Sequence, residues 1–525
     1  MKVLSLLLSF CFLLNLGLAF FANSFKPSKD PFYKAPPDIA SYKEGEIIRW
    51  RDTPRRIRSL FVPNFRVQSA WQYMVKSTDT HGQPIGIVAT LLEPKNADTS
   101  KLVAYNYWQD SACVDCAPSY SILFGAGVAT VSTQIETIIM DQALARGWYV
   151  VATDYEGPNA AFGASVLGGQ AVLDAIRGAL KSSDKSKLKA DAKVAIWGYS
   201  GGTIPLSWAG TLQPKYAPEL SENLIGVAVG GWATNFTSVI ETIDGTMWSG
   251  LVGAGVLGIT TEYPEIKKDL FNHVGPWHVR RLKKLYDKCL VGTLLAYFQA
   301  DFFRSRSPIF TEGYAFFKRP EIKTVMDDNT LALDNTRPIP EVPFFVYHGE
   351  KDELVPFDNS QRVYDMWCSQ GIKSMEFAVS KTSDHTRELL QGMGAALSWL
   401  TMRFKGDAPV KGCVRIVRNS NWDYPDANTE ANREASASLE KAIQQVIGPF
   451  KSGKKDEKSA ESSLNAVLDE QAKAAPEEAK ADPGEEPLES PGNPASDEPE
   501  ESPESPESPE HTEAEEPTKS GNNTV

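Results

Sequence analysis

The stretch WGYSGG, residues 197–202, follows a short apolar run at 194–197 and comes directly before a helix-like run. A tight turn between a strand and a helix would by itself explain these small residues. The spacing Gly198-x-Ser200-x-Gly202 also matches the nucleophile elbow, in which a strained turn exposes the serine hydroxyl and the glycines avoid clashes with the adjoining strand and helix. A motif with so few fixed positions recurs by chance, so the rest of the chain must supply a base, an acid and an oxyanion hole.

Apolar runs typical of β-strands alternate with helical patterns on both sides of this turn. Helical patterns are expected at 141–146 and 170–177. The strand-like runs lie at 86–92, 101–107, 148–152, 194–197, 225–230, 342–347 and 375–379. Apolar strands that alternate with helices predict an α/β fold, in which a mostly parallel sheet is covered by helices on both faces.

The alternation of strands and helices stops between Gly230 and Pro340. This segment contains a run of small and apolar residues at 250–258, followed by aromatic pairs. Because it is too long for a loop within a compact domain, we expect an inserted, mainly helical cap at about residues 235–335. In a serine hydrolase such a cap would cover the carboxyl end of the sheet and form an apolar acyl pocket. Ordinary helices packed beside the core are the alternative.

The N-terminal residues are typical of a cleaved secretory signal. Lys2 precedes a mostly apolar stretch that runs to Phe21, with a small-residue end at either Gly17-Leu18-Ala19 or Phe20-Phe21-Ala22. We therefore predict a signal peptide at residues 1–22 and a secreted, extracellular protein. A membrane anchor fits less well, because the run is near the lower length limit for spanning and no other stretch of about 20 apolar residues follows it.

The opposite end of the chain differs from the rest in composition and charge. Residues 451–525 hold 21 acidic residues against 7 lysines, a net charge of −14, and the whole chain carries −13, which leaves +1 for residues 1–450. This Glu-, Pro- and Ser-rich tail cannot bury enough apolar surface to fold, so we predict a disordered tail and a folded domain at 23–450. The tail is a candidate solubiliser, spacer, cell-wall contact segment or inert linker. The nearly neutral body has no electrostatic footprint for nucleic acid.

The cysteines of a secreted protein are expected to form disulfides. Without Cys11 of the signal, five cysteines remain, which predicts two disulfides and one free thiol. The pair Cys113-x-x-Cys116 lacks a second pair, and no histidine or cysteine pair has the spacing of zinc ligands, so we expect no metal and no other cofactor. The sequon at 235–237 predicts N-glycosylation of Asn235 in an exposed segment. The sequence assigns no oligomeric state.

A serine hydroxyl becomes a good nucleophile only when a histidine takes its proton and a carboxylate orients the imidazole. In this fold the histidine follows both the serine and the acid along the chain. The candidates are His81, His273, His278, His348, His385 and His511. His81 precedes the serine, His511 lies in the tail, and two others fall in the cap. His385 follows the strand-like run 375–379 by a short loop, where the base belongs. His348 stays an alternative, although its acid would have to come from the cap.

The acid should lie in the loop that follows the preceding strand-like run. Asp352 comes three residues after a glycine turn and just before a Leu-Val-Pro run, in a setting where this acid is usual, although Glu350 and Glu353 stay as alternatives that could equally be solvated loop charges. Asp384 is adjacent to the histidine along the chain. Because adjacent side chains diverge, we expect it to be an ordinary loop residue.

An oxyanion hole needs two backbone N–H groups, one from the residue after the nucleophile and one from a loop after an early strand. Gly201 supplies the first of these groups. The loop at 108–111 contains Asp110 and Ser111, either of which offers the second.

These motifs together resemble the fungal secretory lipase family, of the Candida antarctica lipase A kind. The resemblance spans about residues 30–450 and leaves the tail outside. It is carried by the segments 105–120, 154–158, 198–202, 349–356 and 384–385. Each motif alone is common, but their joint occurrence is specific.

The resemblance implies an α/β-hydrolase that acts as a secreted triacylglycerol lipase, hydrolysing acylglycerol esters at a lipid/water interface to free fatty acids. It implies a catalytic triad of Ser200, Asp352 and His385. It also implies oxyanion N–H groups at Asp110 and Gly201. A carboxylesterase for short soluble esters would share every catalytic residue, and an acyltransferase or a serine peptidase of the same fold fits less well. From a different class, a catalytically inactive lipid-binding or surface-adhesion protein is the alternative.

The resemblance also implies a pairing of the cysteines, namely Cys116–Cys289 and Cys368–Cys413. Cys113 then has no partner, which departs from the family pattern. A competition between Cys113 and Cys116 for the same partner therefore stays open.

Overall fold

The computed structural model describes residues 25–62 and 65–447, all of which belong to one compact unit. The predicted signal peptide at 1–22 and the predicted tail at 451–525 lie outside the described residues, so both stay predictions. Among the helices of the described ranges, none combines the length and the apolar character that a bilayer crossing demands.

A single sheet organises the described part of the chain. Its ten strands are β1 (Ile47–Asp52), β2 (Val67–Thr78), β3 (Pro84–Pro94), β4 (Asp98–Asn106), β5 (Trp148–Thr153), β6 (Lys193–Tyr199), β7 (Leu224–Gly230), β8 (Phe344–Gly349), β9 (Ser374–Ser380) and β10 (Gly412–Arg418). They are ordered β1-β2-β3-β5-β4-β6-β7-β8-β9-β10. The pairs β1–β2, β2–β3 and β3–β5 are antiparallel, and every later pair is parallel. Asn106 pairs with Gly198, so the loops that leave β4 and β6 start side by side.

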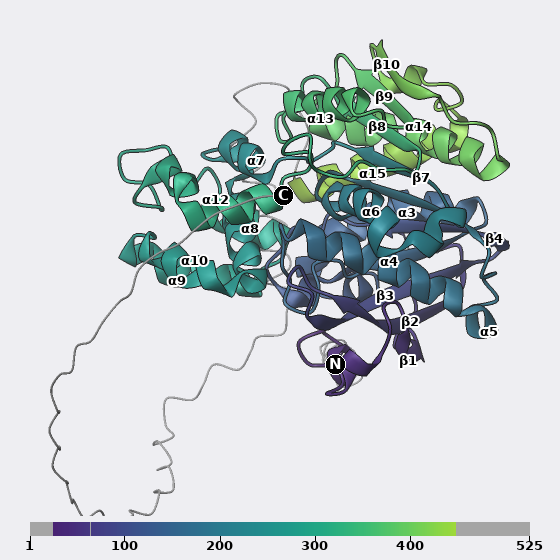
Figure 1. The fold of residues 1–525 in the computed structure, drawn as a ribbon, viewed down its shortest axis with the longest axis horizontal. Coiled ribbons are helices and arrows are strands. Elements are labelled where there is room, and N and C mark those ends of the chain that lie inside the picture. The colour runs from purple at the N-terminus through teal and green to yellow at the C-terminus, as the bar shows by residue number, and fades with distance from the viewer. Residues whose placement is uncertain (1–24, 63–64, 448–525) are drawn as a thin grey trace, which may run out of the picture. The chain divides into compact units, whose positions relative to one another are not determined.

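Helices cover both faces of this sheet (Figure 1). One face packs against α3 (Val131–Ala145), α14 (His385–Lys405) and α15 (Glu430–Ile447), and the other packs against α4 (Ser165–Lys181), α6 (Thr203–Tyr216) and α13 (Phe357–Ser369). Strand β6 shows how its sequence serves both faces. Ala195 and Trp197 join the first apolar cluster, whereas Val194 and Ile196 join the second, because successive strand residues point to opposite faces.

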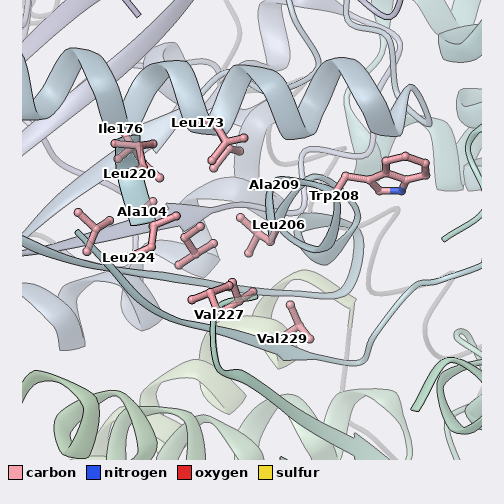
Figure 2. Close-up of a cluster of buried hydrophobic side chains, with 14 of the residues drawn as sticks. Ala104, Leu173, Ile176, Leu206, Trp208, Ala209, Leu220, Leu224, Val227 and Val229 are labelled. Carbon is pink, nitrogen blue, oxygen red and sulfur yellow. The ribbon is translucent and has the colours of Figure 1, made fainter. Parts of the chain in front are cut away.

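The second cluster fills the space between the sheet and two helices. Figure 2 shows Leu206 of α6 between Leu173 of α4 and the valines Val227 and Val229 of β7. All four side chains are fully buried. This packing fixes the direction of α6, the helix that follows the WGYSGG turn.

Short helical turns lie between the larger elements of the sheet layers. They are η1 (Pro31–Tyr33), η2 (Ile39–Ser41), η3 (Val114–Cys116), α2 (Pro118–Ser121), η4 (Val128–Thr130), α5 (Ser183–Ser186), η5 (Ser200–Gly202), η6 (Pro218–Glu222) and η9 (Asn421–Asp423).

The segment between β7 and β8 is helical (Figure 1, teal), and most of its apolar side chains form one cluster, which Phe162 and Leu354 join from outside the segment. Its central helix α8 is buried along almost its whole length, and the aromatic residues noted in the sequence, such as Phe302 and Phe316, are buried there as well. The helices are α7 (Phe236–Ile243), α8 (Ser249–Glu262), α9 (Pro264–Asn272), α10 (Pro276–Lys283), η7 (Lys284–Asp287), α11 (Leu290–Ala296), η8 (Gly313–Lys318) and α12 (Pro320–Asp328).

The predicted α/β fold with a mostly parallel sheet is confirmed, and each of the predicted strands is present within a few residues of its expected bounds. Three strands, β1, β2 and β10, were not predicted. Polar and charged residues interrupt their apolar pattern, since β1 and β10 are the edges of the sheet and β2 has a partly exposed first half.

Candidate active site

Ser200 lies on the sharp turn between β6 and α6. It has a positive φ of 51°, a left-handed conformation that is costly for a residue with a side chain. A Cβ atom at Gly202 would lie 2.3 Å from the carbonyl oxygen of Asn106, so only glycine fits at that position. The strained serine and the close glycine have the geometry that the motif predicted for a nucleophile elbow.

His385 is the first residue of α14 and follows β9 by a short loop. Its Nε2 lies 2.9 Å from Ser200 Oγ, and its Nδ1 lies 2.7 Å from Asp352 Oδ2. Two backbone contacts hold this residue in place. Its N–H donates to Glu353 at 3.0 Å, and its carbonyl oxygen accepts from the Tyr199 hydroxyl at 2.6 Å.

Asp352 lies in the loop after β8, and its side chain is fully buried. Its Oδ1 accepts the backbone N–H groups of Leu354 at 3.0 Å and Val355 at 2.7 Å, which leaves Oδ2 for the imidazole of His385. A buried carboxylate with this many donors is held both in its ionised form and in one orientation.

The other carboxylates near the histidine have different contacts. Glu350 is exposed and lies 3.9 Å from Arg415, and Glu353 contacts the backbone of His385 rather than its ring. Asp384, which we expected to be an ordinary loop residue, accepts the N–H of Arg387 at 2.8 Å and so caps the first turn of α14. The geometry therefore separates Asp352 from the alternatives.

His348, the alternative base in the sequence analysis, contacts Asp352 instead of the serine. Its Nε2 lies 3.1 Å from Asp352 Oδ2 and 3.2 Å from the carbonyl oxygen of Val355. Its Nδ1 accepts the N–H of Trp232 at 3.2 Å, so the ring proton is on Nε2 and points toward the carboxylate. Sequence reasoning missed this contact. The available signal was the spacing of four residues between His348 and Asp352 across a glycine turn.

The electrostatics of these residues favour an ionised acid beside a basic imidazole. Burial alone would lower the pKa of His385, but the charge and hydrogen bond of Asp352 outweigh it, and the pKa is raised. Burial likewise acts to raise the pKa of Asp352, yet the contacts with His385 and His348 bring it well below its ordinary value. Such a pair stabilises the imidazolium that forms when a serine gives up its proton.

The loop after β4 brings Asp110 against the turn that carries Ser200. Asp110 has a positive φ of 48°. A Cβ atom at Gly201 would lie 1.8 Å from Asp110 Oδ1, so any side chain there would displace the Asp110 carboxyl. The N–H of Ser111 donates to Glu156 at 3.3 Å. Glu156 also takes a backbone hydrogen bond from Asp110, so this carboxyl does not separate Asp110 from Ser111 as the second oxyanion donor.

Several carboxyl groups are buried around this loop. Asp110 Oδ1 has no hydrogen-bond partner within the described ranges. Burial raises the pKa of Asp110 to about 7, although the charge of His385 acts in the opposite direction. Burial also raises the pKa of Glu136 and of Glu156 well above the ordinary value. Protonated neighbours of this kind leave the loop compatible with a negatively charged oxyanion.

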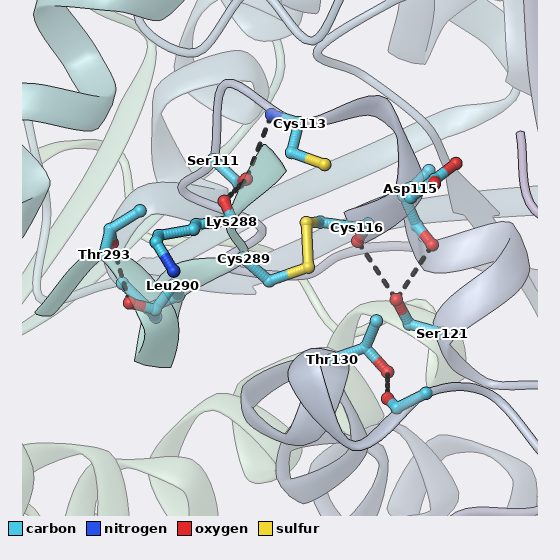
Figure 3. The surroundings of a disulfide bond; sticks show 12 residues. Ser111, Cys113, Asp115, Cys116, Ser121, Thr130, Lys288, Cys289, Leu290 and Thr293 are labelled. Carbon is cyan, nitrogen blue, oxygen red and sulfur yellow. Dashed lines mark hydrogen bonds between the residues drawn. A yellow bond between two sulfur atoms is a disulfide. The ribbon is translucent and has the colours of Figure 1, made fainter. Parts of the chain in front are cut away.

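A disulfide and a hydrogen bond join the loop after β4 to the helical segment (Figure 3). Cys116 pairs with Cys289, 173 residues away, directly before α11. Ser111 Oγ donates to the carbonyl oxygen of Lys288 at 2.9 Å. Cys113 is a buried free thiol beside both sulfur atoms, and burial raises its pKa to about 11. A thiol that is mostly protonated is a weak competitor for the disulfide.

The second disulfide is partly buried at the β10 edge of the sheet, against the apolar cluster on the α13 face. Cys368 at the end of α13 pairs with Cys413 in β10, 45 residues away. It ties the edge strand β10 to a helix of the neighbouring layer. Both pairings are those that the family resemblance implied.

A cavity of about 120 Å³ opens beside Ser200 and His385. Its walls come from the loop after β4, from α3, from α8 and α11 of the helical segment, and from α15. The apolar lining consists of Trp108, Ile135, Trp248, Leu251, Leu290, Val291, Leu294, Leu354, Leu389, Ile443 and Val446. The reacting groups thus face an apolar space.

Two further sequence predictions concern modification and metals. Asn235 caps α7 by accepting the N–H of Ser238 at 3.0 Å, and it is partly buried rather than exposed as expected. Its glycosylation stays a prediction. Within residues 25–62 and 65–447, no group of three or more His, Cys, Asp and Glu side chains could hold a metal ion.

Comparison with known proteins identifies the family. Residues 122–412 match the model of the secretory lipase family. Lipase 4 of Candida albicans is 42% identical over 424 residues, which cover 81% of this chain and 92% of that relative. The chain belongs to the secretory lipase family. Lipase 6 of Candida albicans is 40% identical to this secretory lipase over 83% of the chain and 93% of the relative. The resemblance inferred from the motifs is confirmed, and a secretory family fits the predicted extracellular location.

Solved structures agree with this assignment. An X-ray structure of Candida antarctica lipase A in its closed state aligns with a TM-score of 0.71 and 27% identity, covering 79% of this chain and 95% of that one. A rice cell wall degrading esterase, LipA from Xanthomonas oryzae, aligns with a TM-score of 0.54 at 14% identity, which supports the fold alone.

Proposed function

We propose that this secretory lipase is a triacylglycerol lipase that hydrolyses acylglycerol esters at a lipid/water interface and releases free fatty acids. One observation carries the proposal. The hydrogen-bonded chain from Ser200 through His385 to Asp352 ends at an apolar cavity of about 120 Å³. A polar reacting group at the end of an apolar space suits an ester whose acyl part is a hydrocarbon.

In the proposed reaction Ser200 Oγ attacks the ester carbonyl carbon and gives its proton to His385 Nε2, 2.9 Å away. Asp352 steadies the imidazolium through Nδ1–H. His385 then donates the proton to the departing alcohol oxygen, and the acyl group stays on the serine. A water molecule, deprotonated by the same imidazole, attacks the acyl-enzyme and releases the fatty acid.

The negative charge that develops on the carbonyl oxygen is assigned to the N–H groups of Gly201 and Asp110. The close approach of the Asp110 carboxyl to Gly201 supports Asp110 for this role, because it puts the two N–H groups on loops in van der Waals contact.

The cavity is smaller than the lower end of the usual range for small-molecule sites, about 300 Å³. A long acyl chain therefore requires its walls to move apart. Residues 235–335 act as a movable cap in this proposal. Most of their apolar side chains pack in one cluster, which supports that role because the segment holds together as a unit.

The remaining organisation of the chain is part of the same proposal. Residues 1–22 direct secretion, 23–450 form the lipase domain, and the acidic tail at 451–525 extends from it, with the cell wall as a candidate contact. Glycosylation at Asn235 would add to the secreted character. No cofactor enters the mechanism.

Hydrolysis of p-nitrophenyl esters from acetate to palmitate tests the proposal, with the wild type beside Ser200→Ala. We expect Ser200→Ala to lower kcat by about 10³-fold or more while the fold is kept, because the serine provides the attacking oxygen. Activity on long chains that depends on Ser200 supports a lipase. Full activity of the folded variant would remove Ser200 from the mechanism.

The small cavity favours one second candidate, a carboxylesterase for short soluble esters. Activity confined to acetate and butyrate, with no increase when the substrate exceeds its solubility, would select it. Folded wild-type protein that hydrolyses none of the esters and fails to react with an organophosphonate would instead indicate an inactive lipid-binding protein.

A further inference from the structure

A tryptophan side chain projects into solvent from the helical segment between β7 and β8. Trp277, in the first turn of α10, is 93% exposed, more than any other large apolar side chain of the described residues. The opposite side of α10 is used for packing, since Leu282 is fully buried. The indole is therefore not needed to hold this helix, and burying it would require a partner outside the described chain.

Cationic side chains lie on the same face of α10. Arg280 and Arg281 follow Trp277 by three and four residues, so all three share one side of the helix, and both arginines are exposed. The face continues onto α9, because Lys283 of α10 lies 4.8 Å over the ring of Phe271. We call the exposed residues of this surface the basic cap face. They are Lys267, Lys268, Trp277, Arg280, Arg281 and Lys284.

The positive charge is concentrated here and is not neutralised locally. Residues 264–288 contain seven lysines and arginines against three acids, a net charge of +4, whereas the whole of 1–450 carries +1. In the described part of the chain, none of these seven basic side chains is ion-paired with a carboxylate. Asp269, the acid on α9 nearest to them in sequence, is paired with Arg319 at 2.9 Å instead.

The basic cap face is directly connected to the wall of the cavity. From α10 the chain passes through η7 to Cys289, where the disulfide to Cys116 holds it, and enters α11. Leu290 and Leu294 of α11 line the cavity beside Ser200. A surface that binds α10 would therefore act on the same chain segment that must move to admit an acyl chain.

We propose that the basic cap face docks on an anionic lipid–water interface. This inference rests on the proposed function, because lipolysis releases fatty acids whose carboxylates make the interface negative. Tryptophan is stable at the boundary between hydrocarbon and water, and lysine and arginine are attracted to anionic headgroups within a Debye length of about 10 Å. The combination of an exposed indole and cations without carboxylate partners on one helix face matches that surface better than a neutral one.

Flotation of the full chain with lipid vesicles tests the docking. Phosphatidylcholine vesicles are compared with vesicles that also contain ionised oleic acid. We expect oleate to strengthen binding of the wild type and added salt to weaken it. Arg280→Glu/Lys284→Glu should lower binding to oleate vesicles by about tenfold or more, since each cation near such a surface contributes about 1 kcal/mol. Trp277→Ala should lower binding to both kinds of vesicle.

Matched variants control for general effects on charge and apolar surface. Lys187→Glu/Lys189→Glu reverses two exposed charges outside the helical segment, and Leu60→Ala removes an exposed apolar side chain, 64% exposed, that also lies outside it. Both should bind vesicles as the wild type does. Equal losses in these controls, or wild-type binding by the basic cap face variants, would overturn the docking. A basic cap face variant whose oligomeric mass in solution changes while its vesicle binding does not would also overturn the docking. That result would assign the face to contact with a second copy of this chain.

Hydrolysis of soluble p-nitrophenyl butyrate separates the docking from the proposed function. All variants of the basic cap face should keep the wild-type kcat/KM, because none of these residues lines the cavity. Wild type that hydrolyses the ester through Ser200 but shows no preference for oleate vesicles would end the docking proposal alone. Wild type without Ser200-dependent hydrolysis would end the proposed function, whatever the vesicles show.

Discussion

The loops that leave β4 and β6 place two similarly strained residues next to each other by different means. They start from the paired residues Asn106 and Gly198, and each holds a non-glycine residue at positive φ, 48° for Asp110 and 51° for Ser200. The β6 loop has glycines around its serine. The β4 loop contains no glycine from residue 107 to 117 and depends on contacts with remote segments. A strained conformation can thus be encoded locally or imposed by distant parts of the chain.

The close contact between Asp110 of the β4 loop and Gly201 of the β6 loop predicts the largest effect on kcat. Gly201→Ala would place a Cβ 1.8 Å from Asp110 Oδ1, so the buried Asp110 carboxyl must move away from the elbow. We expect kcat for p-nitrophenyl butyrate to fall by about 10²-fold, the usual cost of losing an oxyanion donor, with the fold retained by circular dichroism.

A second substitution should repair this damage. Asp110→Gly in the Gly201→Ala background removes the clashing carboxyl, and glycine adopts positive φ freely, so we expect about a tenfold recovery of kcat. Gly210→Ala is the control, because Gly210 and Gly201 both lack a positive φ but the atom nearest to the Cβ added at Gly210 is Val227 Cγ2 at an ordinary 3.5 Å. Full activity of Gly201→Ala would show that the contact between Asp110 and Gly201 does not position the reacting groups.

The dependence of the β4 loop on remote contacts predicts that its disulfide matters for rate. Cys116→Ser/Cys289→Ser should lower kcat by between about tenfold and 100-fold, since small misplacements of reacting groups cost that much. It should also lower the free energy of unfolding by about 2–5 kcal/mol, measured in denaturant.

Cys368→Ser/Cys413→Ser is the matched comparison. This disulfide ties α13 to β10 and has no contact with either loop, so stability should fall while kcat of the folded protein stays near the wild-type value. Equal losses of kcat in both double variants would mean that the Cys116–Cys289 bond acts through stability alone.

The loop after β8 carries Asp352, whose carboxylate is also held by His348 of β8. Loss of the His348 contact should have a smaller effect. His348→Asn cannot reach the carboxylate, so we expect kcat to fall by about tenfold, the value of one hydrogen bond to a buried charge, with KM unchanged. Asp352 then becomes more basic and stabilises the His385 imidazolium more. The acidic limb of the pH–rate profile should therefore move to higher pH.

His348→Gln should restore most of the rate, because its amide N–H₂ reaches about as far as Nε2 of the histidine. If the acidic limb of the pH–rate profile stays at the wild-type pH in His348→Asn, His348 only fills space beside Asp352.

The sequence predicts the parts of the molecule whose geometry is local. The alternation in β6, with Ala195 and Trp197 on one face and Val194 and Ile196 on the other, follows from strand periodicity. The elbow follows from its glycines, and the order of serine, acid and histidine limits the other candidates. These features need no knowledge of distant contacts.

The parts that could not be predicted are fixed by distant contacts. Nothing in the neighbourhood of Asp110 indicates positive φ, because the loop is held by Glu156, Lys288 and Cys289. The role of His348 as a partner of Asp352 depends on the N–H of Trp232, which fixes its ring proton. The helices at 236–328 were expected only as a mainly helical segment, since α8 is apolar on every side and shows no periodic pattern.

The buried carboxyl of Asp110 predicts the smallest effect, a falling limb in the pH–rate profile. Its pKa of about 7 leaves it neutral at lower pH and charged at higher pH, where it repels the developing oxyanion, so kcat/KM should fall as pH rises through that value. The titration of His385 has the opposite effect: kcat/KM rises with pH, because the base must be unprotonated. Asp110→Asn tolerates positive φ and should be several-fold faster than the wild type at alkaline pH.

Asp154→Asn is the control, since burial raises the pKa of Asp154 to about 7 as well, but its carboxylate binds Ser119 rather than the elbow. A falling limb that disappears in Asp110→Asn and persists in Asp154→Asn would place the titrating group on the β4 loop, whereas its persistence in both would assign it elsewhere.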